Sequence, residues 1–213
     1  GGERISLEEL CAAWMGTLEK IFPNNAHPVP VTKDVPLWEK RENKAPAIKV
    51  ARPRVFIPAF PGTNCEVDSA RAFEKAGAQC EILVVKNLSV SDIEETIDRM
   101  EKAIRRAQIV MLPGGFSGGD EPEGSGKFIA TTFRNPRIAQ AVTDLLEARD
   151  GLMLGICNGF QALIKLGLVP YGKITEPKED DPPLTFNTLG RHVSRMVYTL
   201  SLIHISEPTR HLR

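Results

Sequence analysis

The pattern of hydrophobic and polar residues changes along the chain, and its middle part alternates between the two periodicities of regular structure. Short apolar runs have the length of buried strands and lie at 54–60, 79–85, 108–112 and 151–155. Between and after these runs, apolar residues recur at helical spacing, over 65–76, 91–104, 136–149 and 158–166. Strands that alternate with helices predict an α/β fold with a doubly wound, mostly parallel sheet.

Capping signals indicate where two of the predicted helices begin. Ser6 and Glu9 form a capping box ahead of an apolar stripe, so we expect a helix over 6–22. Ser91 and Glu94 form the same signature ahead of the helix that leads to the third strand. Both helices should therefore begin with a side chain that satisfies free backbone N–H groups.

The first 53 residues differ from the part that follows. The helix at 6–22 cannot bury its apolar stripe alone, so it must dock on other chain, and we favour chain that precedes it. Residues 23–53 are rich in proline and charge, which is typical of an extended linker. We therefore expect the alternating domain to begin near residue 54.

The fourth apolar run leads directly into the sequence Gly-Ile-Cys-Asn-Gly at 155–159. A nucleophile between two glycines, at a turn from strand to helix, is the pattern of a nucleophile elbow. The N-terminus of the following helix favours a thiolate at Cys157, and its free N–H groups can hold an oxyanion. The alternative is that Cys157 is a small apolar residue that only fills space.

A glycine-rich loop at 113–126 follows the third predicted strand. In a parallel sheet, ligands bind beyond the carboxyl ends of the strands, where this loop, the turn at 61–64 and the Cys157 elbow should meet. Gly114 and Gly115 would then bring backbone N–H groups close to a carbonyl bound at Cys157. The alternative interpretation is an ordinary flexible surface loop.

Charge and cysteine content narrow the classes of function. Lys and Arg together number 27, and so do Asp and Glu. The formal net charge is therefore zero and does not favour a nucleic-acid or membrane partner. The four cysteines are widely separated, without the spacing of a disulfide framework or a metal site. No signal peptide or membrane-spanning run is visible, which favours a reducing cytoplasm.

Several motifs together resemble the glutamine amidotransferase domain of phosphoribosylformylglycinamidine synthases of the large single-chain type. The matching stretches are 61–66, 112–117, 155–161, 184–187 and 190–195. The resemblance covers about 6–199 and implies a flavodoxin-like, class I amidotransferase fold with a nucleophile elbow. It divides the chain into a remnant of the preceding synthase domain (1–22), a linker (23–53), the amidotransferase domain (54–199) and a tail (200–213).

The resemblance implies that the thiolate of Cys157 attacks the side-chain amide of glutamine and releases ammonia. The N–H groups of Gly115 and Asn158 would form the oxyanion hole. Contacts to glutamine would come from Gly114, Phe116, Gln161, Asn187 and Arg191. The partner would be an ATP-dependent synthase domain, absent here, which uses ammonia in purine synthesis and holds ATP and Mg²⁺. No cofactor and no metal are expected in this domain.

The sequence departs from that family near its C-terminus. The family's catalytic His and Glu lie close together, downstream of the strand that 191–198 resembles, and no such pair follows here. Residues 200–213 resemble a translated sequencing adapter, so we expect a non-native tail and a chain that is truncated at both ends and inactive by itself. Two alternatives stay open: a thiol hydrolase on the same elbow, and a non-catalytic flavodoxin-like module that merely packs Cys157.

Overall fold

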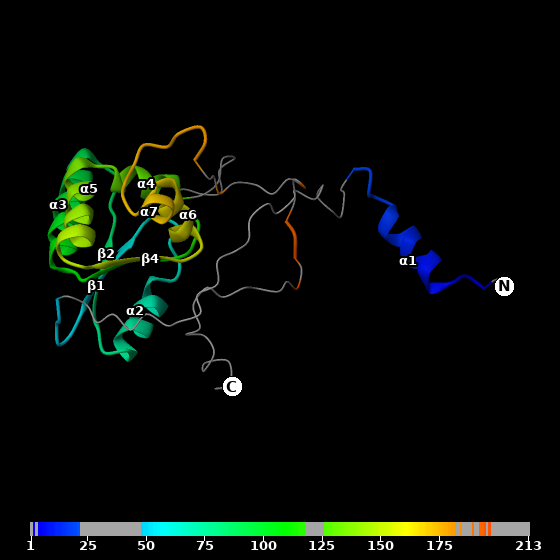
Figure 1. Ribbon diagram of the computed structural model, residues 1–213, viewed down its shortest axis with the longest axis horizontal. Helices are drawn as coiled ribbons and strands as arrows, with labels where there is room; N and C mark the ends of the chain where they lie inside the picture. Colours follow the sequence, from blue (N-terminus) through cyan, green and yellow to red (C-terminus); the bar gives the residue numbers. More distant parts are fainter. Residues whose placement is uncertain are drawn as a thin grey trace. The chain divides into compact units, whose positions relative to one another are not determined.

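The computed structural model describes residues 2, 4–21, 48–117, 126–181, 184, 189, 192–194 and 196. Two compact units are present, one formed by Gly1–Ala45 with Phe186–Arg213 and the other by Pro46–Thr185. Within the described residues, the first unit contains the helix α1 (Leu7–Gly16) and the second contains the sheet and its helices (Figure 1). The described helices include none that is both long and apolar enough to cross a membrane.

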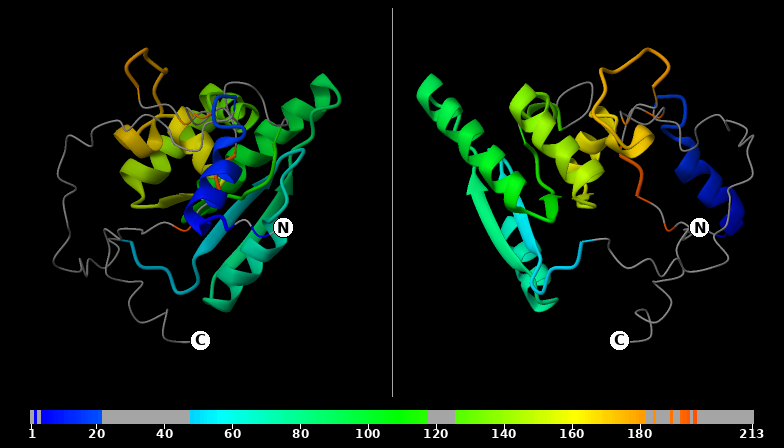
Figure 2. Two further views of the ribbon diagram at one scale, coloured as in Figure 1. Left: turned by 90° about the vertical axis from the view of Figure 1, so that its right-hand side faces the viewer. Right: turned by 60° about the vertical axis from the view of Figure 1, so that its left-hand side comes forward.

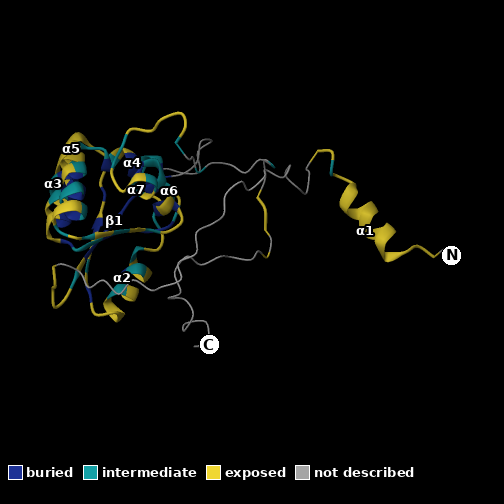
Figure 3. Cartoon of the chain, viewed as in Figure 1, coloured by how far each residue is buried: buried dark blue, intermediate teal, exposed yellow. Residues whose placement is uncertain are grey.

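The predicted capping box at the start of α1 is confirmed. The Glu9 N–H donates to Ser6 Oγ at 3.1 Å, and the Ser6 N–H donates to the Glu9 carboxylate at 3.1 Å. The helix ends at Gly16, six residues before the predicted end, because glycine is a poor helix former. Residues 17–21 continue in tighter turns. Residue 22, the last of the predicted helix, and residues 23–47 of the predicted linker lie outside the described residues. Figure 3 shows α1 exposed throughout.

The predicted parallel sheet is confirmed in the second unit. Its described strands are β1 (Arg54–Ala59), β2 (Gln79–Val84), β3 (Ile109–Leu112) and β4 (Leu152–Gly155). They are ordered β2-β1-β3-β4, and every pair is parallel. The carboxyl ends of all four strands therefore lie at one edge of the sheet, as the alternation of strands and helices requires.

Helices cover both faces of this sheet, so it is doubly wound. One face carries α2 (Glu66–Lys75), and the other carries α3 (Val90–Arg106), α4 (Lys127–Phe133), α5 (Pro136–Thr143) and α6 (Asn158–Lys165), with α7 (Leu168–Tyr171) packed on α6 (Figures 1 and 2). Successive strand residues point to opposite faces. Phe56 thus joins the larger core under α3, whereas Ile57 joins the smaller core under α2.

Some predicted helix boundaries were wrong. The cap of α3 is Ser89, whose Oγ accepts from the Asp92 N–H at 3.1 Å, rather than Ser91 with Glu94. Two short helices, α4 and α7, were not predicted. Each follows a left-handed glycine that supplies no capping side chain, so the usual start signal is missing. The helix expected over 136–149 ends at Thr143 and continues as a π-helical turn, Asp144–Ala148.

The expectation that β4 is fully buried was also wrong. Its residues on the α2 side of the sheet are exposed, with Leu152 at 63% and Leu154 at 43% of their full accessible area. In the described part of the chain, α2 packs on β1 and β2 and does not cover β4. A buried strand and a half-covered one have the same apolar sequence, and only the neighbouring layer distinguishes them.

The corrected start of α3 gives a simple test. Ser89→Ala should lower the free energy of unfolding by about 1 kcal/mol, because the N–H of Asp92 loses its acceptor. Ser91→Ala, at an exposed position inside the helix, should change it by less than about 0.5 kcal/mol. Urea unfolding followed by circular dichroism measures both. Equal losses for the two variants would contradict the assignment of the cap.

Candidate active site

Cys157 lies at a sharp turn between β4 and α6. The strand ends at Gly155 and the helix begins at Asn158, so the predicted change from strand to helix is confirmed. The backbone of Cys157 has φ 52° and ψ −108°, a conformation that residues with a side chain rarely adopt. The thiol is exposed and lies at the N-cap of α6. The turn therefore displays the sulfur beyond the end of the strand.

The two glycines around Cys157 permit the close packing of this turn. A Cβ on Gly155 would lie 2.6 Å from the carbonyl carbon and oxygen of Gly159. A Cβ on Gly159 would collide with the carbonyl oxygen of Leu112, the last residue of β3. Any side chain at either position would push α6 away from the sheet and displace Cys157 with it.

The glycine-rich loop after β3 lies directly beside Cys157. A Cβ built on Gly114 would be 3.4 Å from the Cβ of Cys157. Gly115 forms an antiparallel bridge with Thr63 in the turn after β1, in which the Asn64 N–H donates to the Gly114 carbonyl at 3.1 Å. The three loops that the sequence placed at one edge of the sheet are therefore in contact with one another.

Two backbone N–H groups in these loops are available to a ligand. The bridge with Thr63 uses the N–H groups of Asn64 and Phe116 and leaves that of Gly115 unused. Asn158 is the first residue of α6, and the first N–H groups of a helix have no partner within it. Among the described residues, neither Gly115 nor Asn158 donates its N–H to another part of the chain.

A buried polar network fastens the glycine-rich loop to α6. The side-chain oxygen of Asn158 accepts from the Ser117 N–H at 3.3 Å and from the Ser117 hydroxyl. The Asn158 amide group in turn donates to Gln161 Oε1 at 3.2 Å. Ser117 and Asn158 are 2% and 1% exposed, so the bonds between these two residues are shielded from water. Sequence reasoning missed Ser117 as a functional candidate, although it ends the motif at 112–117.

The remaining predicted site residues divide into two groups. Phe116 lies in the glycine-rich loop and is 57% exposed, and Gln161 is held through its contact with Asn158. Asn187 and Arg191, assigned to glutamine by resemblance, lie outside the described residues. The described part of the chain contains no group of three or more His, Cys, Asp or Glu side chains arranged to hold a metal ion.

The other cysteines of the sheet unit have different surroundings. Cys65 is exposed at the N-cap of α2, and its sulfur lies 3.9 Å from the Cβ position of Gly114, on the same rim as Cys157. Cys80 is half-buried, and its thiol donates to the Ala70 carbonyl at 3.4 Å. Burial raises the pKa of the Cys80 thiol, and the Glu74 carboxylate raises it further.

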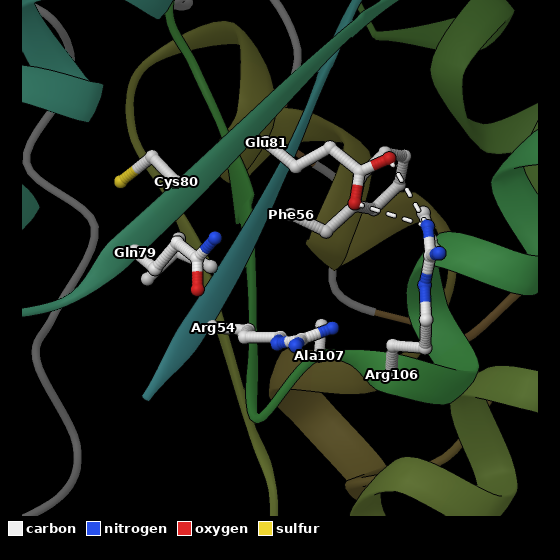
Figure 4. Close-up of a pocket in the computed structure, with 9 residues that line it drawn as sticks. Arg54, Phe56, Gln79, Cys80, Glu81, Arg106 and Ala107 are labelled. Atoms are coloured by element: carbon white, nitrogen blue, oxygen red, sulfur yellow. Dashed lines mark hydrogen bonds and ion pairs between the residues drawn. The ribbon is translucent and has the colours of Figure 1, made fainter. Parts of the chain in front are cut away.

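A small pocket opens at the opposite edge of the sheet. Its walls come from the start of β1, the start of β2 and the end of α3 (Figure 4). Arg106 pairs with Glu81 across it at 3.2 Å. Because the strands are parallel, this amino-terminal edge is remote from the loops around Cys157, and we assign the pocket no role in their chemistry.

Comparison with known proteins agrees with this geometry. Residues 52–209 match the family of CobB/CobQ-like glutamine amidotransferase domains. The chain belongs to this family. The glycine-rich loop and the Cys157 elbow both lie within the matched region of this amidotransferase domain.

The individual relatives of the amidotransferase domain carry more specific names. The chain is 36% identical over 151 residues to phosphoribosylformylglycinamidine synthase subunit PurQ of Methanococcus maripaludis, covering 71% of this chain and 50% of the relative. The same subunit of Dehalococcoides mccartyi is 33% identical over 153 residues, covering 70% and 52%. The chain thus spans about half the length of these curated relatives. A solved structure titled "Structure of PurLQS from Thermotoga maritima" matches with 30% identity and a TM-score of 0.38, over 55% of this chain and 45% of that one.

The packing of the elbow predicts a large effect of one methyl group. Gly159→Ala should cost about 3 kcal/mol of folding stability or more, because the added carbon collides with the Leu112 carbonyl. Gly77→Ala is the matched control, since Gly77 has φ 96° but open space around it, and should cost only about 1 to 2 kcal/mol. Urea unfolding compares the two. A smaller loss at Gly159 than at Gly77 would show that α6 does not approach β3 so closely.

The buried network predicts a second effect. Ser117→Ala removes one of the two donors to the Asn158 side chain and should lower the stability of the amidotransferase domain by about 1 to 2 kcal/mol. Ser91→Ala serves as the exposed reference, with a change under about 0.5 kcal/mol. Thermal unfolding of both variants measures the difference. No loss in the Ser117 variant would mean that the network contributes nothing to holding the loop.

Proposed function

We propose that this chain is the glutaminase domain of a phosphoribosylformylglycinamidine synthase, and that Cys157 is its nucleophile. The observation that carries the proposal is the elbow. An exposed thiol in strained backbone lies beside Gly114, with the N–H groups of Gly115 and Asn158 unused in the described structure. The relatives that carry this enzyme's name supply the choice of substrate.

In the proposed reaction, the Cys157 thiolate attacks the side-chain amide carbon of glutamine. The carbonyl oxygen becomes an oxyanion, which the N–H groups of Gly115 and Asn158 hold by hydrogen bonds. The carbon–nitrogen bond then breaks, the nitrogen takes up a proton and leaves as ammonia, and a thioester remains on Cys157. Water attacks the thioester, releases glutamate and restores the thiol.

The proton transfers require a base, and the unit that contains the sheet has no histidine that could act as one. None of the four histidines lies between residues 46 and 185. We propose that the catalytic His and Glu belong to native sequence downstream of residue 199, which this chain does not carry. The exposed apolar side of β4 offers a surface on which such sequence would pack. The matched region is about half the length of the relatives, so the relatives carry further sequence.

The ammonia would pass to a synthase domain that holds ATP and Mg²⁺ and amidinates formylglycinamide ribonucleotide. We propose that this partner lies upstream on the same polypeptide, with α1 as its last helix, because the apolar side chains of α1 are exposed and need a surface to cover them. The matched relatives are named as separate subunits. The genomic reading frame upstream of this chain distinguishes the two arrangements.

Ammonia release from glutamine tests the catalytic proposal. The chain as given should be slower by about a thousandfold or more than a version extended with its native downstream sequence. Cys157 would lack the catalytic His and Glu, and loss of one of three such cooperating groups typically has that effect. Cys157→Ala should abolish the activity of the extended version. Equal activity of both forms, abolished by Cys157→Ala, would show that this chain holds its own base, with His192 the first residue to examine.

Alkylation tests the nucleophile separately from turnover. Iodoacetamide should modify Cys157 several times faster than Cys80, because Cys157 is exposed whereas burial raises the pKa of Cys80. Peptide mass spectrometry at increasing reaction times measures both rates in one sample. Equal alkylation rates would favour the alternative interpretation, a non-catalytic flavodoxin-like module in which Cys157 only packs.

A further inference from the structure

Cys65 lies beside Cys157 although the two are 92 positions apart in the numbering. The Cβ position of Gly114 is 3.9 Å from the sulfur of Cys65 and 3.4 Å from the Cβ of Cys157. Because both distances are measured from one point, they set an upper limit of about 7 Å between that sulfur and that carbon, within reach of the side-chain and loop movement that a disulfide needs. Gly114 places no side chain between them.

Both cysteines are exposed and lie at the start of a helix. Each cysteine is an exposed N-cap residue whose side chain makes no capping hydrogen bond. The main chain on each side is held by the first turn of its helix, through the Ser69 N–H to the Cys65 carbonyl at 2.9 Å and the Gln161 N–H to the Cys157 carbonyl at 3.0 Å. A disulfide would therefore require rotation of both side chains and a shift of the turn at 61–64.

Cys80 shows that this arrangement is particular to the pair. Its thiol is half-buried and bonded to the Ala70 carbonyl, on a strand rather than at a helix end. Burial raises its pKa, which keeps it in the unreactive thiol form. Cys80 can therefore serve as the control thiol for Cys65 and Cys157.

We propose that Cys65 is a resolving cysteine, which captures Cys157 in a reversible disulfide when a hydroperoxide oxidises the site. The Cys157 thiolate attacks one oxygen of hydrogen peroxide, and the O–O bond breaks. The hydroxide that leaves takes up the proton that the thiol released, so sulfenic acid and water form. The Cys65 sulfur then attacks the Cys157 sulfur, the S–O bond breaks, and the hydroxyl leaves with the Cys65 proton as water. Two thiols lose two electrons, and one peroxide becomes two waters.

The consequence is a modification that switches the nucleophile off without destroying it. A sulfenic acid without a neighbouring thiol is oxidised further to sulfinic acid, which thiols do not reduce. A disulfide with Cys65 is returned to two thiols by a dithiol reductant. This inference rests on the proposed role of Cys157 as a reactive thiolate, and it adds a function for Cys65.

The experiment uses the full chain in a Cys11→Ser background. The reduced protein is treated with one to a few equivalents of hydrogen peroxide, blocked with N-ethylmaleimide, digested without reductant and examined by mass spectrometry. We expect a peptide pair linked through Cys65 and Cys157, which dithiothreitol separates. Cys65→Ser should abolish the pair and convert Cys157 to sulfinic acid, whereas Cys80→Ser should leave the pair unchanged.

A second variant tests the geometry. Gly114→Ala adds a methyl group at ordinary contact distance from both cysteines, so the fold should be retained. The methyl group takes up space next to both cysteines and limits their approach, so the rate of disulfide formation should fall by about tenfold. The melting temperatures of Gly114→Ala and Cys65→Ser, measured by circular dichroism, confirm that each variant is folded.

The outcomes separate this inference from the proposed function. If a protein that retains Cys65 forms sulfinic acid at Cys157 and no linked peptide pair, Cys65 is not a resolving cysteine. Cys157 would still be a reactive thiol in that case. Pairing of Cys157 with Cys80 as readily as with Cys65 also overturns the resolving role. Resistance of Cys157 to both peroxide and iodoacetamide overturns the reactive nucleophile itself, and the resolving role with it.

Discussion

The contact of α6 with the ends of β3 and β4 is the constraint on which the candidate site depends. It is made through Gly159, where main chain meets main chain with no room for a side chain. Because α6 lies so close to the sheet, the chain must turn sharply between Gly155 and Asn158, and Cys157 takes a positive φ. The strain at Cys157 is thus a direct result of packing two elements more closely than side chains would allow.

The same constraint determines where the neighbouring loop lies. With α6 fixed, the buried side chain of Asn158 is at the right height to accept from Ser117, and this bond holds the glycine-rich loop over the elbow. The bridge between Gly115 and Thr63 adds the turn after β1 to the assembly. Three loops from three strands therefore hold one another, through main-chain bonds and the Asn158 side chain, without a charged side chain.

This arrangement relates the proposed chemistry to the proposed modification. A cysteine nucleophile needs close access for a substrate carbonyl, and glycine at 114 leaves that access open. The same open space leaves Cys65 within reach of Cys157. A larger side chain at 114 that excluded the second thiol would also crowd the substrate. The space that the proposed catalysis requires is therefore the space that gives Cys65 access to Cys157.

The sequence by itself determined the number and direction of the described strands, the elbow, and the edge at which the loops meet. These features depend on local periodicity and on the geometry of parallel strands, which no distant contact alters. It also indicated Cys157, because glycines around a cysteine at a turn from strand to helix are a local pattern. The roles expected of Gly115 and Asn158 came from the resemblance to the amidotransferase family.

Only the tertiary structure decided the rest. Ser117 bonds to Asn158, and Cys65 lies near Cys157. Each pair joins residues far apart in the chain, and a local pattern of hydrophobic residues does not indicate such contacts. The short helix α4 follows a glycine without a capping side chain, so its packing rather than its sequence signals defines it. The exposure of Leu152 and Leu154 depends on which layer covers the sheet, a property of neighbouring elements that a strand's own residues do not encode.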